Sequence, residues 1–172
     1  SPTTGLVLRN VGIRNTGGPC ITMANTMLSQ FENIALSQPV EAGANNTPYM
    51  VATGCFNGNR IINLGLLCSG PNAGDPSGGL IRIVDDGVFD PHHNLLLGCW
   101  DENIRLPEGG SIVYLAGNEN VISDWQSFDT DAPVGNTTNT CWFRLVKPSV
   151  FSAGGNIIRG VIPGRQNTPD AI

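Results

Sequence analysis

Carboxylates are the residues of this chain whose types and spacing most directly suggest chemistry. The chain has 14 Asp and Glu residues, which concentrate between Asp75 and Asp131. Glycoside hydrolysis uses two carboxyl groups flanking one bond, about 5–5.5 Å apart in retaining enzymes and about 6.5–9.5 Å apart in inverting enzymes. Glu102 and Asp124 are separated by roughly the length of one coil of a solenoid repeat. This separation would place them on neighbouring coils. We therefore predict Asp101, Glu102 and Asp124 as candidate catalytic residues.

Tryptophans in the same region suggest sugar binding. Trp100 and Trp125 lie about one repeat apart, and the face of an exposed aromatic ring accepts the C–H side of a pyranose. We predict Trp100 and Trp125 as substrate-binding residues, together with the neighbouring acids Asp85 and Asp86. The alternative for the tryptophans, Trp142 included, is core packing, where a large aromatic side chain buries about 150–250 Å². The alternative for the acids is a role in turns.

Other catalytic chemistry is not indicated. A pectate-type lyase would need a basic proton acceptor and, as a rule, carboxylate-bound calcium, and no Asp cluster at fixed spacing accompanies the arginines. His92 and His93, between Pro91 and Asn94, predict a turn rather than a general base or a metal ligand set. The chain has no nucleophile elbow, phosphate loop or dinucleotide fingerprint. We therefore expect neither a metal nor a cofactor.

The five cysteines are widely spaced and form no C-x-x-C pair. This pattern is typical of neither a disulfide scaffold nor a zinc site. Most of them adjoin apolar residues, as Cys68 adjoins Leu67 and Cys99 adjoins Leu97-Gly98. The sequence therefore predicts buried, unpaired thiols, which favours assembly in a reducing cytosol.

The composition indicates a folded, turn-rich β protein. The chain is 40% hydrophobic, with 22 Gly and 12 Pro, and no stretch carries the i, i+3, i+4, i+7 stripe of an amphipathic helix. Charged residues make up 13%, and the net charge is −5. A chain without a basic stripe is not expected to bind nucleic acid. No apolar run reaches the roughly 18 residues of a membrane span, so we expect no membrane insertion.

A degenerate repeat organises the chain. Asn followed by apolar, any and apolar residues recurs at intervals within the roughly 20–50 residues of solenoid repeats. Asn tolerates the left-handed conformation of a sharp corner, and its amide can bond to the same amide on neighbouring turns. The alternative is an ordinary turn residue. The copies begin at Asn10, Asn33, Asn63 and Asn94, with weaker ones at Asn120 and Asn156.

These features predict an all-β, right-handed parallel β-helix of about six irregular coils, in which coils stack at about 4.8 Å to bury their apolar faces. We expect one domain over residues 1–172, either part of a longer chain or a processed product, since no Met begins it. Turn-rich loops are expected at residues 38–48, 69–79, 129–139 and 164–169. A β-sandwich is the alternative, because it also has short alternating strands every 8–12 residues or so.

Residues 5–15, 59–68 and 155–160 resemble the pectin-lyase-like parallel β-helix superfamily, especially bacteriophage tailspikes and related virion fibres. The resemblance is architectural and covers most of the chain. It implies carbohydrate-related work: polysaccharide lyases, glycoside hydrolases, epimerases, and trimeric spikes that bind or cleave surface glycans. Fold alone does not give function, so the site must decide among these.

Three functions follow from the residues and the resemblance. The first is a virion tailspike or fibre module that recognises host-surface polysaccharide as a homotrimer, located on the virion or, alternatively, secreted. The second is a glycan-degrading hydrolase or lyase that uses the acids between Asp85 and Asp124. The third is a purely structural β-solenoid stalk. Low charge and unpaired cysteines favour the first.

Overall fold

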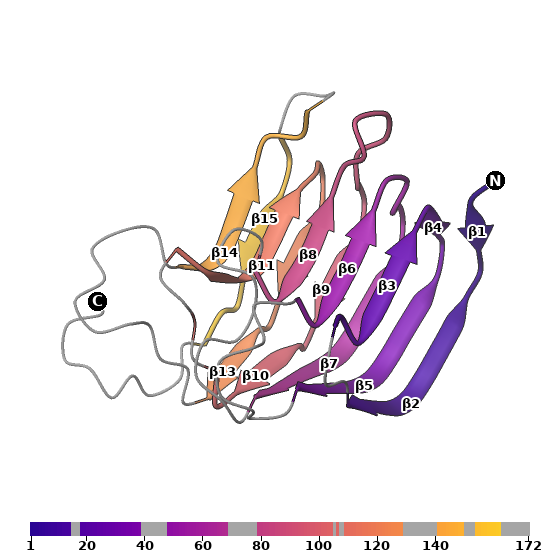
Figure 1. Ribbon diagram of the computed structural model, residues 1–172. Helices are drawn as coiled ribbons and strands as arrows, with labels where there is room; N and C mark the ends of the chain where they lie inside the picture. The colour runs from indigo at the N-terminus through magenta and orange to yellow at the C-terminus, as the bar shows by residue number, and fades with distance from the viewer. Residues whose placement is uncertain are drawn as a thin grey trace.

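The computed structural model describes residues 1–14, 18–38, 48–68, 79–104, 106, 109–128, 141–149 and 154–162. Within these residues the chain forms fifteen β-strands and no helix (Figure 1). Each strand pairing among them is parallel. The all-β prediction is confirmed, and the β-sandwich alternative is wrong, because sandwiches are built from antiparallel sheets. The four expected loops fall largely outside the described residues.

The largest sheet stacks six levels of chain. Three long strands form its first levels: β2 (Val7–Arg14), β5 (Gln30–Gln38) and β7 (Arg60–Cys68). The next two levels are each split into a pair of short strands, β9 (Leu95–Leu97) with β10 (Trp100–Glu102), and β12 (Val121–Ser123) with β13 (Gln126–Phe128). β7 pairs with both β9 and β10, so each short pair takes the place of one long strand. The last level is β15 (Ile157–Arg159).

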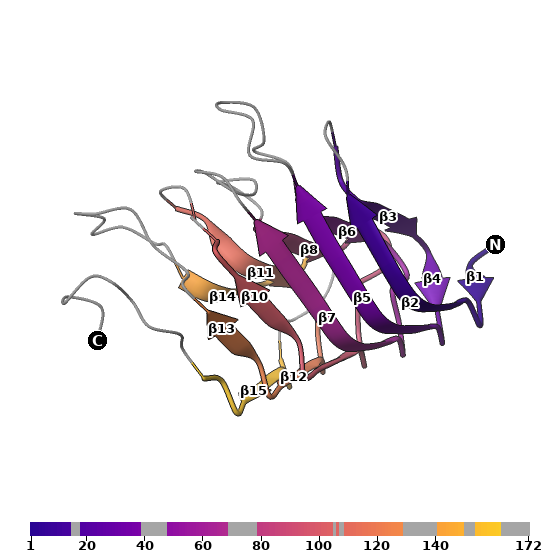
Figure 2. The ribbon, with the colours of Figure 1, turned by 90° about the horizontal axis from the view of Figure 1, so that it is seen from below.

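A second sheet and a short third column complete each level. The second sheet contains β3 (Ile21–Ala24), β6 (Met50–Thr53), β8 (Ile81–Val84), β11 (Ser111–Ala116) and β14 (Cys141–Val146). The third column begins with β1 (Thr3–Thr4) and β4 (Thr26–Met27) and continues as single bridges through Asn57, His92 and Asn118. We call one passage through the large sheet, the second sheet and the third column a circuit. Figure 2 shows successive circuits lying side by side.

The apolar core lies between the sheets and is built from columns of inward-facing side chains. One column, in strand register, consists of Phe31, Ile61, Leu96 and Ile122, and each is at most 3% exposed. Burial of each such side chain stabilises the fold by roughly 1.5–3 kcal/mol. Because no single circuit can enclose this core, the stacking itself supplies most of the stability.

Asparagines form an exposed column at the corner that bends the long strands. Asn10, Asn33 and Asn63 have φ of 56°, 54° and 52°, a left-handed conformation that Asn tolerates better than most residues. Their amides form a ladder, in which Asn33 Nδ2 donates to Asn10 Oδ1 and Asn63 Nδ2 donates to Asn33 Oδ1, both at 2.9 Å. In later circuits this corner is occupied by Gly98, Asp124 and Gly160, also with positive φ.

A second column of asparagines is buried where the third column meets the large sheet. Nδ2 of Asn59, Asn94 and Asn120 donates to Oδ1 of the next asparagine, at 3.1, 2.9 and 3.1 Å. The backbone N–H of each also donates to that oxygen, at 2.9–3.0 Å. The remaining amide hydrogen bonds a backbone carbonyl, such as Phe56 O for Asn94 at 2.6 Å. The ladder ends at Asn156 and is fully hydrogen-bonded over its length.

The Asn-apolar repeat of the sequence therefore combines asparagines from two different columns, the exposed corner ladder and the buried ladder. Its first three copies, at Asn10, Asn33 and Asn63, lie at the exposed corner, whereas Asn94, Asn120 and Asn156 belong to the buried ladder. Both columns immediately precede a strand segment, so both produce the same Asn-apolar pattern. The predicted ladder and corner roles of the asparagines are confirmed. The prediction that all six asparagines occupy one equivalent position in each coil is wrong.

The two columns predict different costs of substitution. Asn94→Ala should lower the free energy of unfolding by about 3 kcal/mol, because Asn59 loses its acceptor inside the protein. Asn33→Ala should cost only about 1–2 kcal/mol, from the left-handed backbone, and Asn33→Gly, which relieves that strain, less still. Urea denaturation followed by circular dichroism measures these differences. Equal losses for Asn94→Ala and Asn33→Ala would contradict the distinction.

Candidate functional site

An aromatic and polar cluster lies on the outer face of β10 and β13. Side chains alternate between half-buried and buried along β10 and between exposed and buried along β13, with Asp101 and Ser127 facing inward. The outward positions pair across the strands, Trp100 with Gln126 and Glu102 with Phe128. Neighbouring strands lie about 4.8 Å apart, so these four side chains share one patch. We call Trp100, Glu102, Gln126 and Phe128 the outer cluster.

Gly65 positions the indole of Trp100. A Cβ atom at Gly65 would lie 2.3–2.9 Å from three atoms of the six-membered ring of Trp100, so the ring lies directly over the glycine backbone. Gly65 is buried for this reason, whereas Trp100 keeps intermediate exposure. Phe128, on the next circuit, is 46% exposed. The cluster therefore presents two aromatic side chains beside a carboxylate and an amide, which suits a ligand with both C–H faces and hydroxyl groups.

Asp101, predicted as catalytic, is fully buried in the core. Its Oδ1 accepts a hydrogen bond from Trp125 Nε1 at 2.6 Å, and its Oδ2 accepts one from Ser127 Oγ at 2.7 Å. Ser127 Oγ also accepts from Trp142 Nε1 at 3.3 Å. Trp125 is 0% exposed and packs edge-on against Phe143, with ring centroids 5.5 Å apart. Asp101 and Trp125 thus belong to a buried network and cannot reach a polysaccharide outside.

The other two predicted acids do not converge on one bond. Glu102 belongs to the outer cluster, whereas Asp124 occupies the corner before β13, with φ 57°, and accepts a hydrogen bond from Ser123 Oγ at 2.8 Å. Asp124 precedes Phe128, the partner of Glu102, by four residues, which is up to about 13 Å along a strand. Glu102 and Asp124 therefore stand at opposite ends of the paired strands β10 and β13.

Asp85 and Asp86, predicted to bind substrate, organise the turn after β8. Asp86 accepts from the backbone N–H groups of Phe89 and Val88 at 2.8 and 2.9 Å, and these bonds hold its pKa below the ordinary value. Partial burial alone would raise the pKa of Asp85, but hydrogen bonds from Ser149 outweigh it, and the pKa is lowered. Both acids lie on the second sheet's side, away from the outer cluster.

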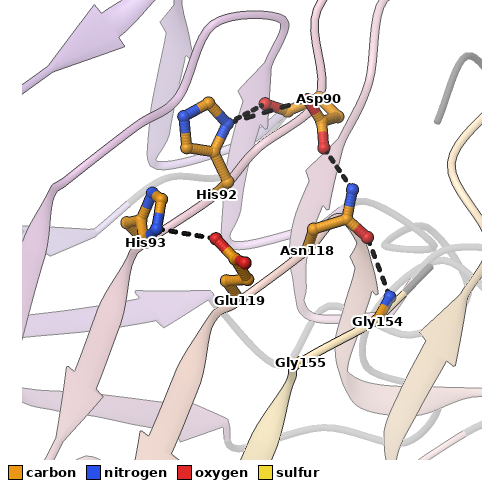
Figure 3. A pocket seen from close by; sticks show the side chains of 7 residues that line it. All are labelled: Asp90, His92, His93, Asn118, Glu119, Gly154 and Gly155. Atoms are coloured by element: carbon orange, nitrogen blue, oxygen red, sulfur yellow. Dashed lines mark hydrogen bonds and ion pairs between the residues drawn. The ribbon is translucent and has the colours of Figure 1, made fainter. Parts of the chain in front are cut away.

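A second polar site, the corner basin, lies at the third column (Figure 3). It is a shallow depression of about 570 Å³ lined by Asp90, His92, His93, Asn118, Glu119, Gly154 and Gly155. His93 Nε2 lies 2.7 Å from Glu119 Oε2, and both side chains are more than half exposed. Asn118 Nδ2 donates to Asp90 Oδ2 at 2.5 Å, while Asn118 Oδ1 accepts from Gly154 N–H at 2.9 Å.

The corner basin follows from the turn chemistry of successive circuits. His93, Glu119 and Gly155 hold the same left-handed corner, with φ of 55°, 53° and 69°. The predicted turn at His92-His93 is therefore confirmed. Each polar side chain of the basin bonds to the next circuit or to its own turn, so the cluster reinforces the stack. Among the described residues, no three His, Cys, Asp or Glu side chains are arranged to hold a metal ion.

The cysteine side chains agree only in part with the prediction of buried thiols outside disulfides. Cys20, Cys55, Cys99 and Cys141 form no disulfide. Cys99 is buried, and desolvation raises the pKa of its thiol to about 12. The other three are half-buried, so the expectation of burial is wrong for them. The side chain of Cys68 is not among the described groups.

Comparison with known proteins adds no family to these observations. Protein-family models, curated proteins and solved structures give no significant match to the chain. In the part of the chain that the structure describes, no helix is long and apolar enough to cross a membrane. The function of the chain must therefore be inferred from the geometry of the outer cluster and its surroundings.

The sequence pointed to Trp100 and Glu102 but missed Gln126, Phe128 and Gly65. The signal was present in the alternation of strand side chains. Counting from the corner residues Gly98 and Asp124 places every second residue outward, which selects Trp100 and Gln126. The corner itself was hard to locate, because Gly and Asp replace Asn there.

Burial of Asp101 predicts a structural rather than catalytic phenotype. Asp101→Ala should lower the free energy of unfolding by about 3 kcal/mol, because it leaves Trp125 Nε1–H and Ser127 Oγ–H without their acceptor. Asp101→Asn retains one acceptor oxygen and should cost less. Urea denaturation monitored by tryptophan fluorescence measures both. An Asp101→Ala variant as stable as the original chain would contradict the buried network.

Proposed function

We propose that this chain is a polysaccharide-binding module built as a right-handed parallel β-helix, with the outer cluster as its glycan contact. One observation carries the proposal: the indole of Trp100 lies over Gly65, on an outer face that also presents Glu102, Gln126 and the exposed Phe128. The stack of parallel circuits supports the β-helix, because each circuit repeats the same three strand positions.

The chemistry of the outer cluster suits a sugar. Because Gly65 has no side chain, the Trp100 ring lies close over the strand backbone, and a pyranose would contact the ring on the side away from Gly65. Glu102 offers a carboxylate acceptor, and Gln126 offers both amide donors and an acceptor, for sugar hydroxyl groups. Because the ring is already held in place, little side-chain entropy is lost when a ligand binds.

Binding is a better account than cleavage. Glu102 faces outward without a second described carboxylate near the same patch, since Asp101 is buried and Asp124 lies at the corner. Glycoside hydrolysis needs two carboxyl groups around one bond. We therefore assign recognition rather than hydrolysis to this face.

The proposal extends to a virion tailspike or fibre that recognises host-surface polysaccharide as a homotrimer. Cys20, Cys55, Cys99 and Cys141 lack disulfides, which suits assembly in a reducing host cytoplasm. Three copies would raise the apparent affinity for a repetitive polysaccharide without new contacts. Sedimentation equilibrium distinguishes this trimer from a monomer of 18.2 kDa.

A panel of bacterial capsular polysaccharides and lipopolysaccharides, presented on a biosensor surface, tests the function. We expect at least one to bind, and Trp100→Ala to weaken that binding about tenfold, equivalent to ~1.4 kcal/mol. Phe89→Ala is the matched control, because Phe89 is an exposed aromatic side chain (49%) in the turn after β8.

The Phe89→Ala variant should bind like the original chain, and circular dichroism should show that both variants keep the fold. The proposal fails if no polysaccharide of the panel binds. It also fails if Trp100→Ala and Phe89→Ala bind equally well.

A further inference from the structure

We propose that His92 and His93, in the corner basin, form a two-imidazole binding site for a divalent transition metal of the Ni²⁺, Cu²⁺ and Zn²⁺ group. The site is separated from the outer cluster by β9 and the corner at Gly98, and the inference does not depend on glycan recognition. Neighbouring residues of an extended strand face opposite sides, so two adjacent histidines converge only where the backbone turns.

A left-handed corner brings the two imidazole rings together. His93 has φ of 55°, and its ring centroid lies 4.9 Å from that of His92, with the ring planes at 81°. The chain contains two histidines, and this corner holds both. Equivalent corners on the neighbouring circuits carry Gly58 and Glu119 instead. The pair of rings is therefore a feature of this circuit and not of the repeat.

Each ring is oriented through one nitrogen by an acceptor oxygen. His93 Nε2 lies 2.7 Å from Glu119 Oε2. His92 Nδ1 lies 3.2 Å from the backbone oxygen of Asp90 and 3.6 Å from Asp90 Oδ1. Carbonyl and carboxylate oxygens accept hydrogen bonds, so the ring nitrogen that faces them carries the proton. A histidine that binds a metal is held in this way as a rule, with its other N–H donated to a carboxylate or a backbone carbonyl.

This arrangement assigns a lone pair to the second nitrogen of each neutral ring, His92 Nε2 and His93 Nδ1. The side chains of His92 and His93 are 37% and 64% exposed, so an ion from solvent reaches them. Figure 3 shows both rings at one end of the basin, each turned by one nitrogen toward its acceptor. The remaining nitrogens are the donor set that we assign to the metal.

The acceptor that orients His92 is itself held by neighbouring circuits. Asp90 is 9% exposed, and its Oδ2 accepts a hydrogen bond from Asn118 Nδ2 at 2.5 Å. Asn118 Oδ1 in turn accepts from the backbone N–H of Gly154 at 2.9 Å. Because these bonds fix the support of the ring before an ion binds, little conformational entropy is lost on binding.

The chemistry of two imidazoles selects the class of metal. Imidazole nitrogen suits Ni²⁺, Cu²⁺ and Zn²⁺, whereas Mg²⁺ and Ca²⁺ prefer oxygen ligands. The described residues bring no third His, Cys, Asp or Glu side chain to the same point, so water completes the coordination. A Cβ atom at Gly154 would meet no atom within 4 Å, which leaves room in the basin for those waters.

Ni²⁺ alone, titrated into the full chain by isothermal titration calorimetry, tests the site. We expect one Ni²⁺ to bind per chain and Mn²⁺ to bind less tightly than Ni²⁺. The double variant His92→Asn, His93→Gly should weaken Ni²⁺ binding at least about tenfold. It introduces the residue types of Asn57-Gly58, which occupy the same positions one circuit earlier, so circular dichroism should show an unchanged fold.

Glu119 has a positioning role that a second pair of variants isolates. Glu119→Gly, which suits the left-handed corner as Gly155 does, should weaken Ni²⁺ binding about tenfold, because loss of such a supporting carboxylate typically costs 10–100-fold in affinity. Glu119→Gln keeps an acceptor oxygen and should restore part of that loss. Glu32→Ala is the matched control, since Glu32 pairs with Arg9 on other circuits, and it should bind Ni²⁺ like the original chain.

Three results would overturn the proposal. The first is absence of Ni²⁺ binding to the original chain. The second is equal binding by the original chain and the double histidine variant, which would place the ion at thiols or acids elsewhere. The third is displacement of Ni²⁺ by Mg²⁺ at equal concentration, which would assign the ion to carboxylate oxygens. Equal binding by Glu119→Gly and the original chain would overturn the role of Glu119.

Discussion

The buried asparagine ladder is the constraint on which the rest of the structure depends. A buried amide without partners costs roughly 1–3 kcal/mol per group, so each of Asn59, Asn94 and Asn120 must sit level with the next rung. That requirement holds although the circuits differ greatly in length, since successive rungs are separated by 35, 26 and 36 residues. The ladder thus fixes the register, and length variation is confined to the turns.

Fixed register has a direct consequence on the outer face. Leu95 follows Asn94 just as Arg60 follows Asn59, so Leu95 pairs with Arg60. The strand segments beyond the corner are then aligned as well, and Trp100 pairs with Gly65. A slip of one residue would turn Trp100 into the core and expose Asp101. The same alignment that satisfies the buried amides therefore creates the outer cluster.

The core changes character along the stack. One inward column contains Leu36 and Leu66 in the early circuits and then Asp101 and Ser127. The polar pair is accommodated because Trp125 Nε1–H and Ser127 Oγ–H occupy both oxygens of Asp101. The acidic residues that suggested catalysis are thus divided between this network, the outer cluster at Glu102, the corner at Asp124 and the turn after β8.

The sequence was sufficient for the class of fold because short alternating strands, scarce charge and recurrent asparagines all point the same way. It was insufficient for the site, because the face of a strand residue depends on its parity from the corner. Trp100 is the second residue after Gly98 and faces outward, whereas Trp125 is the first after Asp124 and is buried. Asn59 was also missed, since Arg60 rather than an apolar residue follows it.

Hydrogen exchange of asparagine side-chain amides, measured by NMR, tests the central claim most directly. We predict that the amide protons of Asn59, Asn94 and Asn120, which are buried, exchange only through global unfolding. The amide protons of Asn10, Asn33 and Asn63, which are exposed, should exchange rapidly. Rapid exchange in both sets would contradict a ladder that holds the circuits in register.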